Sequence, residues 1–468
     1  MSVTAIRPVP GGGLVNLVAR PGAAALLARQ ARTLPSWRLT RRQRCDLELL
    51  ACGGFSPLRG FMGAEDYSRV CESMRLADGT LWPIPVTLDV PDEVAAAVPP
   101  GRSLALRDHD GALLGVLHVT ESWRPDLGAE AVAVFGTGDP AHAGAGYLLR
   151  QTHPWYLGGD LEVPGLPRHP EFGRFRRTPA QVRSEFQRRG WTRVVAFQTR
   201  NPLHRAHLEL TLRAARQADA HLLLHPVVGP TKAGDIEPRT RVRCYQAILR
   251  HYPPGRVLLA LLPLAMRMAG PREALWHAII RKNYGATHFI IGRDHAGPGV
   301  NAAGQPFYHP YASQELVQRH ADEVGIRVMT FRRLVYLPAR GAYLPEDEVP
   351  PGAEAFAISG TELRQRLREG RDLPAWFTPP EIAAELRRAC PPGSVAAAGQ
   401  VDGAVVAEPA RGANRYPPGP TPRPGRPTRR PGPPEPAQRP GQPEPARRPG
   451  QPEPAQRPGQ LEPEGQGG

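Results

Sequence analysis

The 468-residue chain has almost no lysine, few cysteines and no long hydrophobic run. Lysine occurs only as Lys232 and Lys282, so nearly all of the 59 basic residues are arginine, which indicates a general coding bias. Against 44 acidic residues they give a formal charge of +15, which favours anionic ligands. Nucleic acid binding requires basic residues clustered on a face or in a groove, and the charge alone does not predict it. We therefore expect no nucleic acid partner.

The five cysteines are an odd number and include no Cys-x-x-Cys pair. This usage is typical of reduced thiols, so we expect a cytoplasmic protein. Near the N-terminus, the stretch GGGLVNLVARPGAAALLARQ is interrupted by arginine before a long apolar run develops. No segment of about 18 apolar residues is present, so we expect neither a secretory signal nor a membrane partner.

Two common nucleotide-binding motifs are also missing. No G-x-x-x-x-G-K-[ST] occurs, which excludes a P-loop kinase module, and no G-x-G-x-x-G follows a strand. A Ser-His-Asp order cannot be recognised either. The chemistry of this chain must therefore reside in other motifs.

The chain divides into three regions of different pattern. Residues 1–170 mix short strand-like segments with turns and helices, and one predicted strand is LWPIPVTLDV, Leu81–Val90. Residues 171–392 alternate helices with apolar strands, which predicts a parallel sheet with helical crossovers and a C-terminal helical subdomain. Residues 393–468 carry a nine-residue Pro-rich repeat from Arg430 with little apolar bulk, which predicts a disordered tail.

The stretch VVAFQTRNPLHRAH in the second region joins an apolar strand to a polar loop. Asn201 as N-cap and Pro202 as first helical residue predict that a helix begins there. Ligands of a parallel sheet bind beyond the carboxyl ends of its strands, and a helix start offers free N–H groups to an anion. His204 and His207 are predicted to share one face of this helix. With Arg200 before them, the arrangement favours a phosphate site.

Two other interpretations of this stretch are a zinc site and an ordinary helix. A metalloprotease helix carries histidines at i and i+4 with a glutamate between them, whereas the spacer here is Arg205-Ala206. Either histidine alone would be read as an ordinary helix residue. The combination with Arg200 and the helix start favours the phosphate site over both.

Three further segments could contribute to this site. FIIGRDHAGPG has charged residues and glycines at the end of a strand, so we expect it in the same crevice, although it could be a plain turn. In ISGTELRQRL, Ser359 or Thr361 can cap a helix and bind an anion, with Arg364 one turn later, and a capping motif alone explains the pattern equally well. The loop VVGPTKAGDIE, which holds Lys232, is either a lid or an ordinary turn.

These segments resemble the ATP sulfurylases, the sulfate adenylyltransferase family. FQTRNPLHRAH is similar to the family signature Q-T-R-N-P-x-H-R-A-H, IGRDHAGPG to its second signature and AISGTELRQRL to its third. Longer segments follow in matching order, among them CDLELLACGGFSPLRGFMGAEDY and LPLAMRMAGPREALWHAIIRKNYGATHFI. The resemblance covers about residues 10–392.

The resemblance implies a PUA-like domain over residues 1–170 and an α/β catalytic domain of the HxxH nucleotidylyltransferase type over residues 171–392. The implied reaction converts MgATP and sulfate into adenosine 5'-phosphosulfate and pyrophosphate, by in-line attack of sulfate on the α-phosphorus. Mg²⁺ would arrive with ATP, and no protein-bound metal is expected. Adenylylsulfate kinase or reductase and inorganic pyrophosphatase are the implied functional partners, and a homo-oligomer is expected.

The resemblance also assigns roles to residues. Sulfate would be held by Arg200 and Ala296, while His204 and His207 would stabilise the charge that develops on the bridging and pyrophosphate oxygens. The implied catalytic residues are Thr199, Arg200, Asn201, His204 and His207. The implied ATP-binding residues are Gln198, Thr199, Asn201, Gly292, Arg293, Asp294, His295 and Leu334.

The chain departs from the family pattern at a few positions. Pro230 and Ala233 stand where the family usually has Met and Pro, and Leu334 where it usually has Val. Two other functions remain open from the sequence: a catalytically silent protein with an RNA-binding PUA-like domain, and an adenylyltransferase for another acceptor, such as a nicotinamide or pantetheine precursor. The second fits the HxxH pair but not the QTRN and GRDHAGPG blocks.

Overall fold

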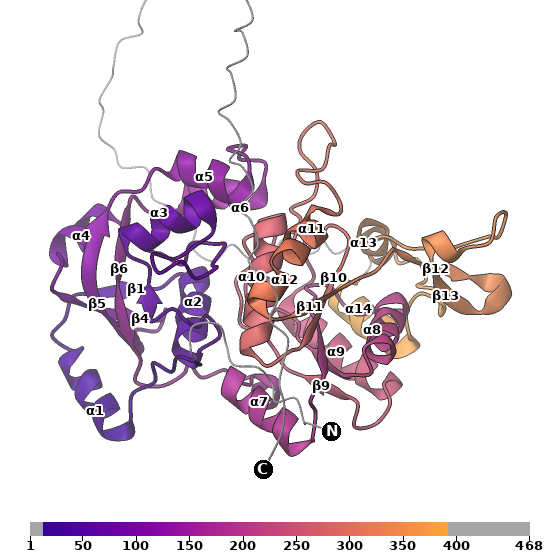
Figure 1. Ribbon diagram of the computed structural model, residues 1–468, viewed down its shortest axis with the longest axis horizontal. Helices are drawn as coiled ribbons and strands as arrows, with labels where there is room; N and C mark the ends of the chain where they lie inside the picture. The colour runs from indigo at the N-terminus through magenta and orange to yellow at the C-terminus, as the bar shows by residue number, and fades with distance from the viewer. Residues whose placement is uncertain (1–12, 392–468) are drawn as a thin grey trace, which may run out of the picture. The chain divides into compact units, whose positions relative to one another are not determined.

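A computed structural model of the chain describes residues 13–391 (Figure 1). For Thr361 the description is limited to the backbone. Segments 1–12 and 392–468 lie outside the described residues, and the predicted disordered tail lies there with them. Across residues 13–391, no helix is long and apolar enough to span a bilayer.

The first region builds a six-stranded sheet with the order β1-β4-β5-β6-β2, in which β3 also pairs with β6. Only β1 and β4 run parallel, and the other pairs are antiparallel. Its strands are β1 (Ser36–Arg38), β2 (Gly60–Phe61), β3 (Leu88–Val90), β4 (Ser103–Arg107), β5 (Leu113–Trp123) and β6 (Trp155–Glu162). Its helices are α1 (Pro21–Gln30), α2 (Arg41–Cys52), α3 (Ala64–Ser73), α4 (Asp92–Ala97), α5 (Leu127–Phe135) and α6 (Ala143–Gln151).

One predicted strand of this region is mostly wrong. Of the predicted Leu81–Val90, only β3 pairs with a neighbouring strand. Pro83 and Pro85 lack the N–H that a strand ladder needs, so the preceding residues form no continuous ladder, and Leu81 makes only an isolated bridge with Arg75. The segment is buried all the same, so its apolar residues pack in the core as irregular backbone.

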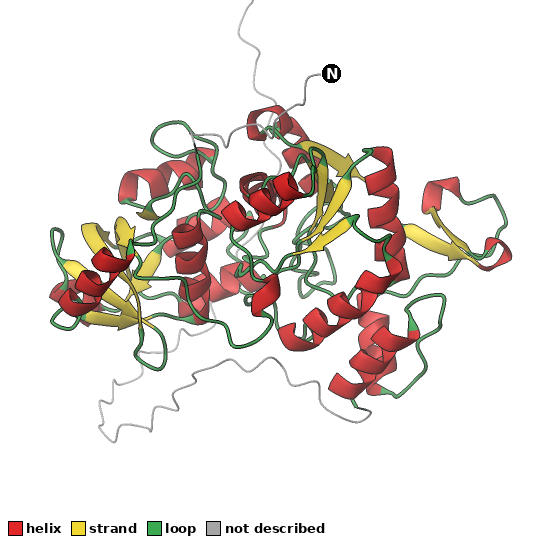
Figure 2. Cartoon of the chain, turned by 90° about the horizontal axis from the view of Figure 1, so that it is seen from below, coloured by secondary structure: helices red, strands yellow, loops and turns green. Residues whose placement is uncertain are grey.

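The second region builds a five-stranded sheet in the order β11-β10-β7-β8-β9, and all its pairs are parallel, as predicted. Its strands are β7 (Val194–Phe197), β8 (His221–Leu224), β9 (Val257–Leu259), β10 (His288–Ile291) and β11 (Arg327–Thr330). The helices are α7 (Pro179–Arg188), α8 (Arg205–Gln217), α9 (Pro238–Ile248), α10 (Gly270–Asn283), α11 (Ala312–Arg319), α12 (Ala321–Val324), α13 (Gly360–Arg368) and α14 (Pro380–Ala389). Four 3-10 turns lie at Gly173–Phe175, Leu249–His251, Pro338–Arg340 and Glu346–Glu348. A separate hairpin joins β12 (Leu334–Leu337) to β13 (Ala342–Pro345) (Figure 2).

The strand order of the parallel sheet explains where a ligand can bind. The chain passes from β7 to β8 and β9 in one direction and then returns to place β10 on the other side of β7. Such a reversal opens a crevice beyond the carboxyl ends of the two adjacent strands. The predicted segments that follow β7 and β10 therefore meet at one edge of the sheet.

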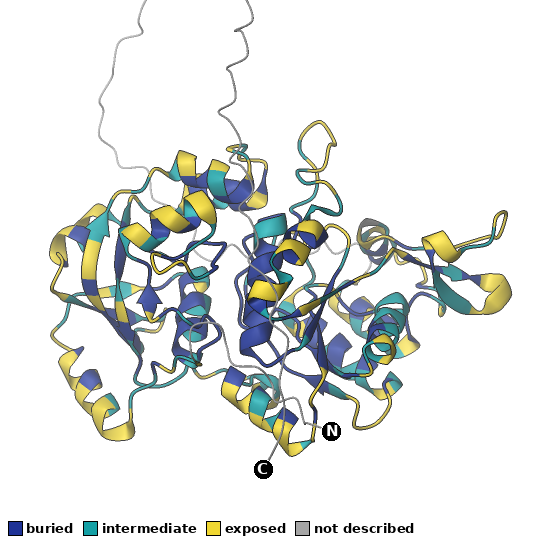
Figure 3. Cartoon of the chain, viewed as in Figure 1, coloured by how far each residue is buried: buried dark blue, intermediate teal, exposed yellow. Residues whose placement is uncertain are grey.

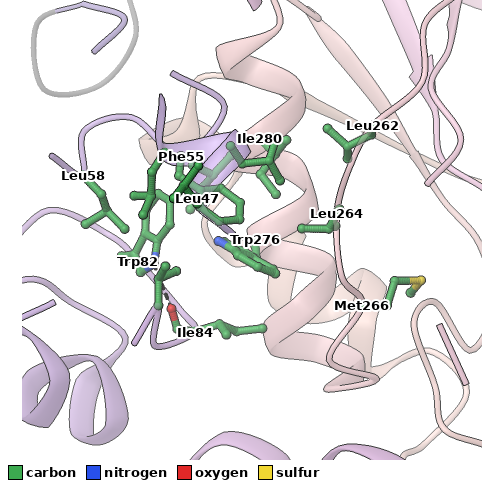
Figure 4. Packing of buried hydrophobic residues seen from close by; sticks show 14 of the residues in the cluster. Leu47, Phe55, Leu58, Trp82, Ile84, Leu262, Leu264, Met266, Trp276 and Ile280 are labelled. Atoms are coloured by element: carbon green, nitrogen blue, oxygen red, sulfur yellow. Dashed lines mark hydrogen bonds between the residues drawn. The ribbon is translucent and has the colours of Figure 1, made fainter. Parts of the chain in front are cut away.

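Helix α10 is buried along nearly its whole length, between the parallel sheet and the first region (Figure 3). On the side of the first region, the Trp276 ring lies 4.8 Å from that of Phe55 and 6.4 Å from that of Trp82, measured between centroids (Figure 4). Leu47 and Ile280 belong to the same hydrophobic core. One continuous core thus joins the two regions, and burial of this apolar surface stabilises both.

Candidate functional site

The site begins where β7 and β10 end. The two strands are paired in parallel with His288 opposite Val195 and Phe289 opposite Ala196. The first predicted segment leaves β7 after Phe197, and the second leaves β10 after Ile291. Both segments therefore start from the same edge of the sheet.

The helix after β7 starts later than predicted. α8 begins at Arg205 with His204 as N-cap, and the His204 side chain makes no capping hydrogen bond. Neither Asn201 nor Pro202 begins the helix, which corrects the prediction. The Tyr245 hydroxyl donates to the carbonyl of Asn201 at 3.0 Å. This bond from α9 holds residues 198–204 as a loop, so they do not enter the helix.

His204 and His207 come together despite the shift of the helix start. Their ring centroids lie 3.9 Å apart, and His204 also stacks on Phe377 at 4.6 Å. The Nδ1 atom of each histidine is buried without a hydrogen-bond partner. Burial lowers the pKa of His207 to about 4 and that of His204 well below its usual value. Both rings are therefore neutral near pH 7, and each has one N–H to donate to an anion.

Arg200, in the segment after β7, forms an ion pair with Asp235. The two side chains are 16% and 3% exposed, so the carboxylate is almost fully enclosed. Asp235 belongs to the loop VVGPTKAGDIE, so this loop contacts the Arg200 side chain, and its role as a lid stays a prediction. Arg241 supports the arrangement from α9, because its Nη1 donates to the carbonyl of Arg200 at 2.9 Å. The structure thus places an anion on the side chain that was predicted to hold sulfate.

Two further cationic side chains lie near this ion pair. Lys232 Nζ, on the same loop, donates to the carbonyl of Pro298 at 3.1 Å and so connects the loop to the second segment. The pKa of Lys232 is lowered first by burial and then by the charges of Arg200 and Arg364. Arg364 from the third predicted segment therefore contributes to the same field. Three cations around one crevice favour an anionic ligand.

The segment after β10 has a strained backbone. Asp294 and Ala296 have φ angles of 52° and 57°, in the left-handed region that non-glycine residues rarely adopt. A Cβ on Gly297 would lie 1.9 Å from Asp294 Oδ1, so a larger residue there would displace the Asp294 side chain. Arg293 and Asp294 are exposed, whereas Ala296 is buried. Strain of this kind is common at ligand-binding sites.

His295 differs from its neighbours, because its ring points inward. It is 8% exposed, and its Nε2 lies 3.0 Å from Nδ1 of His277 on α10. Burial holds the pKa of His295 well below its usual value. A contact of this ring with ATP stays a prediction, and its observed partner lies beneath the crevice.

The remaining predicted residues have smaller observed roles. Gln198 donates from Nε2 to the sulfur of Met266 at 3.8 Å, and Thr199 Oγ1 donates to the carbonyl of Asn201 at 3.1 Å. Ser359 caps α13 by accepting from the backbone of Glu362, as a capping motif predicts. Leu334 begins β12 and is buried.

Several residues of the site were missed by the sequence reasoning. They are Asp235, Arg241 and Tyr245, all from the loop after β8 or from α9. A lysine and an aspartate in one glycine-containing loop could have indicated that this loop belongs to the site. Nothing in the sequence connects Asp235 with Arg200.

One cluster could hold a metal ion among the residues that the structure describes. Asp108, His109 and Asp110 lie in the β4–β5 turn with ligand atoms within 4.8 Å of one another. His109 and Asp110 are exposed, and acidic turns of this kind are common without a metal. This group belongs to the first region and does not include His204 or His207.

Comparison with known proteins relates both regions to a family. A PUA-like domain model matches residues 6–165, and an ATP-sulfurylase model matches residues 173–389. The sulfate adenylyltransferase of Eremothecium gossypii is 53% identical over 383 residues, covering 82% of this chain and 76% of that protein. The one from Saccharomyces cerevisiae is 52% identical over 390 residues, with 82% and 76% covered.

A third curated relative and a solved structure agree with these matches. The sulfate adenylyltransferase of Schizosaccharomyces pombe is 54% identical over 368 residues, with 78% of this chain and 75% of that protein covered. A solved structure titled hexameric APS kinase from Thiobacillus denitrificans superimposes with a TM-score of 0.69 and 35% identity, covering 83% of this chain and 69% of that one.

Proposed function

The chain belongs to the ATP sulfurylase family and is a sulfate adenylyltransferase, and on this premise we propose how its residues carry out the reaction. The enzyme transfers the adenylyl group of ATP to sulfate and releases pyrophosphate. The similarity over most of the chain does not fit an adenylyltransferase for another acceptor. A catalytically silent protein that kept the fold is disfavoured by the intact site residues, which are Arg200, His204, His207, Arg293, Asp294 and His295.

We propose that sulfate takes the place of the Asp235 carboxylate on Arg200. This ion pair is the observation that carries the proposal, because a carboxylate and a sulfate present the same kind of oxygen pair to a guanidinium fork. Ala296 would add a backbone contact, since its strained conformation lies at the end of the neighbouring strand. Sulfate held there would attack the α-phosphorus in line.

The two histidines would act on the other side of the reacting centre. As neutral rings, His204 and His207 can donate N–H to the bridging and pyrophosphate oxygens, where negative charge increases in the transition state. Thr199 and Asn201 would orient the phosphates from the loop before them. The remaining ATP contacts would come from Gln198, Gly292, Arg293, Asp294, His295 and Leu334.

We propose that Mg²⁺ enters as MgATP. Mg²⁺ usually keeps several waters and is held by substrate phosphates with one or two carboxylates. The crevice fits this pattern, since it combines cationic side chains with the exposed Asp294 carboxylate. Mg²⁺ would neutralise phosphate charge, while the chain orients the two substrates.

The cellular setting is also a proposal. We place the domains at residues 1–170, 171–392 and 393–468, the enzyme in the cytoplasm as a homo-oligomer, and its reaction at the start of sulfate assimilation. The phosphosulfate product forms in an uphill reaction, so an adenylylsulfate kinase or reductase and an inorganic pyrophosphatase would have to remove the products.

A coupled assay in both directions tests the function. Pyrophosphate should be released from ATP with sulfate, and ATP should form from adenosine 5'-phosphosulfate and pyrophosphate. Molybdate should replace sulfate and cause continuous breakdown of ATP. If neither anion releases pyrophosphate, the proposed function is wrong. Light scattering on the same sample measures the oligomeric state.

A further inference from the structure

The segment Leu264–Gly270, between β9 and α10, contacts each part of the crevice. The Met266 sulfur accepts from Gln198 at 3.8 Å, and the Met266 amide donates to the carbonyl of Pro230 in the loop that carries Asp235, at 2.9 Å. At its end, the Gly270 amide donates to the carbonyl of Ala296 at 3.2 Å. Its position therefore affects the strand end after β7, the loop that contacts Arg200 and the strained turn after β10.

A buried ion pair attaches this segment to the first region. Arg267 Nη2 donates to Asp46 Oδ2 on α2 at 2.5 Å, and Nη1 donates to the carbonyl of Ala265 at 2.6 Å. The two charged side chains are 1% and 2% exposed. The Arg267 guanidinium therefore holds the turn of the segment and connects it to α2, more than two hundred residues away in the sequence.

Glu273 on α10 supports the other side of the turn. Its carboxylate accepts from the Arg267 amide at 2.9 Å and from the Ala269 amide at 3.0 Å. Between these residues, Met268 has a φ of 60°, a strained conformation that persists only where the surroundings enforce it. The two carboxylates and Arg267 are the groups that hold this turn.

The packing around the ion pair leaves little room for movement. The Arg267 guanidinium lies 5.2 Å from the centre of the Trp276 ring, which packs against Phe55 and Trp82 of the first region (Figure 4). A Cβ on Gly144 of α6 would lie 2.2 Å from the carbonyl oxygen of Arg267, so the backbones of the two regions are in close contact there.

A small polar cavity lies beside the pair. Its volume is about 20 Å³, and Asp46, Arg267, Glu130 and Tyr156 are among the residues that line it. Asp46 Oδ1 and Arg267 Nε are both buried without a hydrogen-bond partner in the protein. A volume of this size can hold about one water molecule.

We propose that Asp46 and Arg267 are positioning residues for adenylyl transfer, through which the first region fixes the segment Leu264–Gly270 and so aligns both substrates in the crevice. Neither residue touches substrate. Buried ion pairs often add little to stability compared with apolar residues of similar size, so stability alone does not account for this one. The inference rests on the sulfurylase activity.

The test separates alignment from folding. In Asp46→Asn, the Arg267 guanidinium loses the carboxylate that it is hydrogen-bonded to. We expect kcat per folded molecule to fall about tenfold or more, because displacements near 1 Å can cost about a hundredfold. The KM values for ATP and sulfate should change less than about twofold, since the binding groups themselves are intact. Rates are measured well below the thermal transition, where circular dichroism shows the folded state.

A double variant distinguishes a structural role. Asp46→Leu with Arg267→Met removes both charges, so the thermal midpoint should return to near that of the wild type while kcat stays low. Amide hydrogen exchange at Met266 and Gly270 should be faster in both variants. If Asp46→Asn does not fold, kcat of the double variant tests the proposal instead. A third variant is Arg267→Lys, which can reach only one of the two acceptors, Asp46 and the Ala265 carbonyl, and should also have a lowered kcat.

The matched control is Asp89→Asn. Asp89 is also a buried carboxylate, but its partners Gln43 and His153 both belong to the first region. We expect it to lower stability and leave kcat per folded molecule and the two amides unchanged. Wild-type kcat in Asp46→Asn, or kcat recovered with stability in the double variant, would overturn the inference. An inactive wild type would instead contradict the function, and the exchange rates would still test the positioning.

Discussion

Replacing Arg200 by alanine should separate sulfate recognition from folding. The planar fork of Arg200 can make two charge-assisted hydrogen bonds to sulfate, each worth about 1.5–3 kcal/mol. Their loss, about 3–6 kcal/mol together, corresponds to a fall of roughly 10²–10⁴ in kcat/KM for sulfate. Binding of ATP alone, measured by calorimetry, should change much less, because its proposed contacts lie on other residues.

The same change leaves Asp235 without its cation. The Asp235 side chain is only 3% exposed, and breaking a buried ion pair by removing one partner can cost about 3–5 kcal/mol. We therefore expect a lower thermal midpoint with cooperative unfolding retained.

The double change Arg200→Ala with Asp235→Ala serves as control. It leaves no unpaired carboxylate, so the thermal midpoint should recover while kcat/KM for sulfate stays low. In Arg200→Lys the charge remains without the fork, and the activity should be intermediate. Our reasoning fails if Arg200→Ala keeps kcat/KM within about tenfold of the wild type, or if the double change restores it.

Three other predictions concern histidines and the tail. His207→Ala should lower kcat by about 10²–10³ with KM for sulfate little changed, and an unchanged kcat would contradict the role of His207. Because the pKa of His207 is about 4, its titration should not affect kcat/KM of the wild type between pH 5 and 7. His142 is fully buried, and its Nδ1 accepts from the Gly144 and Ala145 amides as the cap of α6. Burial lowers the pKa of His142 from 6.5 to about 4. The neutral ring should therefore add about 3 kcal/mol to the free energy of unfolding above pH 6.5, and this contribution should be lost as the pH falls to 4. His142→Asn keeps a capping side chain but cannot titrate, so its free energy of unfolding should lack this pH-dependent contribution. If the free energy of unfolding changes with pH in the same way in the variant and the wild type, the prediction is wrong. Deleting the chain after Pro392 should leave the turnover number unchanged, which the coupled assay measures directly.

Much of the second region could be predicted from local pattern. Thr178 caps α7 and Pro179 is its first residue, and local sequence is enough for this, because side-chain capping depends on residues three positions apart. The alternation of apolar strands with amphipathic helices predicted the parallel sheet, since a crossover helix must cover its face. The charged segments at the ends of β7 and β10 were also identified correctly as strand ends.

Long-range contacts changed several of these expectations. The helix after β7 begins at Arg205 because Tyr245, 44 residues beyond Asn201, binds the carbonyl of Asn201. His295 turns inward because His277 offers a ring nitrogen from α10. Local preferences of Asn and Pro for a helix start are worth about 1 kcal/mol, which a single buried hydrogen bond can match.

The sequence by itself therefore determined most elements of the second region and the chemistry of its motifs, since capping, strand propensity and charge are properties of neighbouring residues. Only the tertiary structure decided which of them meet. It placed β10 beside β7, set Asp235 against Arg200, and joined Asp46 to Arg267 across the two regions. These contacts depend on how distant segments pack together, and a buried charge is costly unless it is paired with an opposite charge.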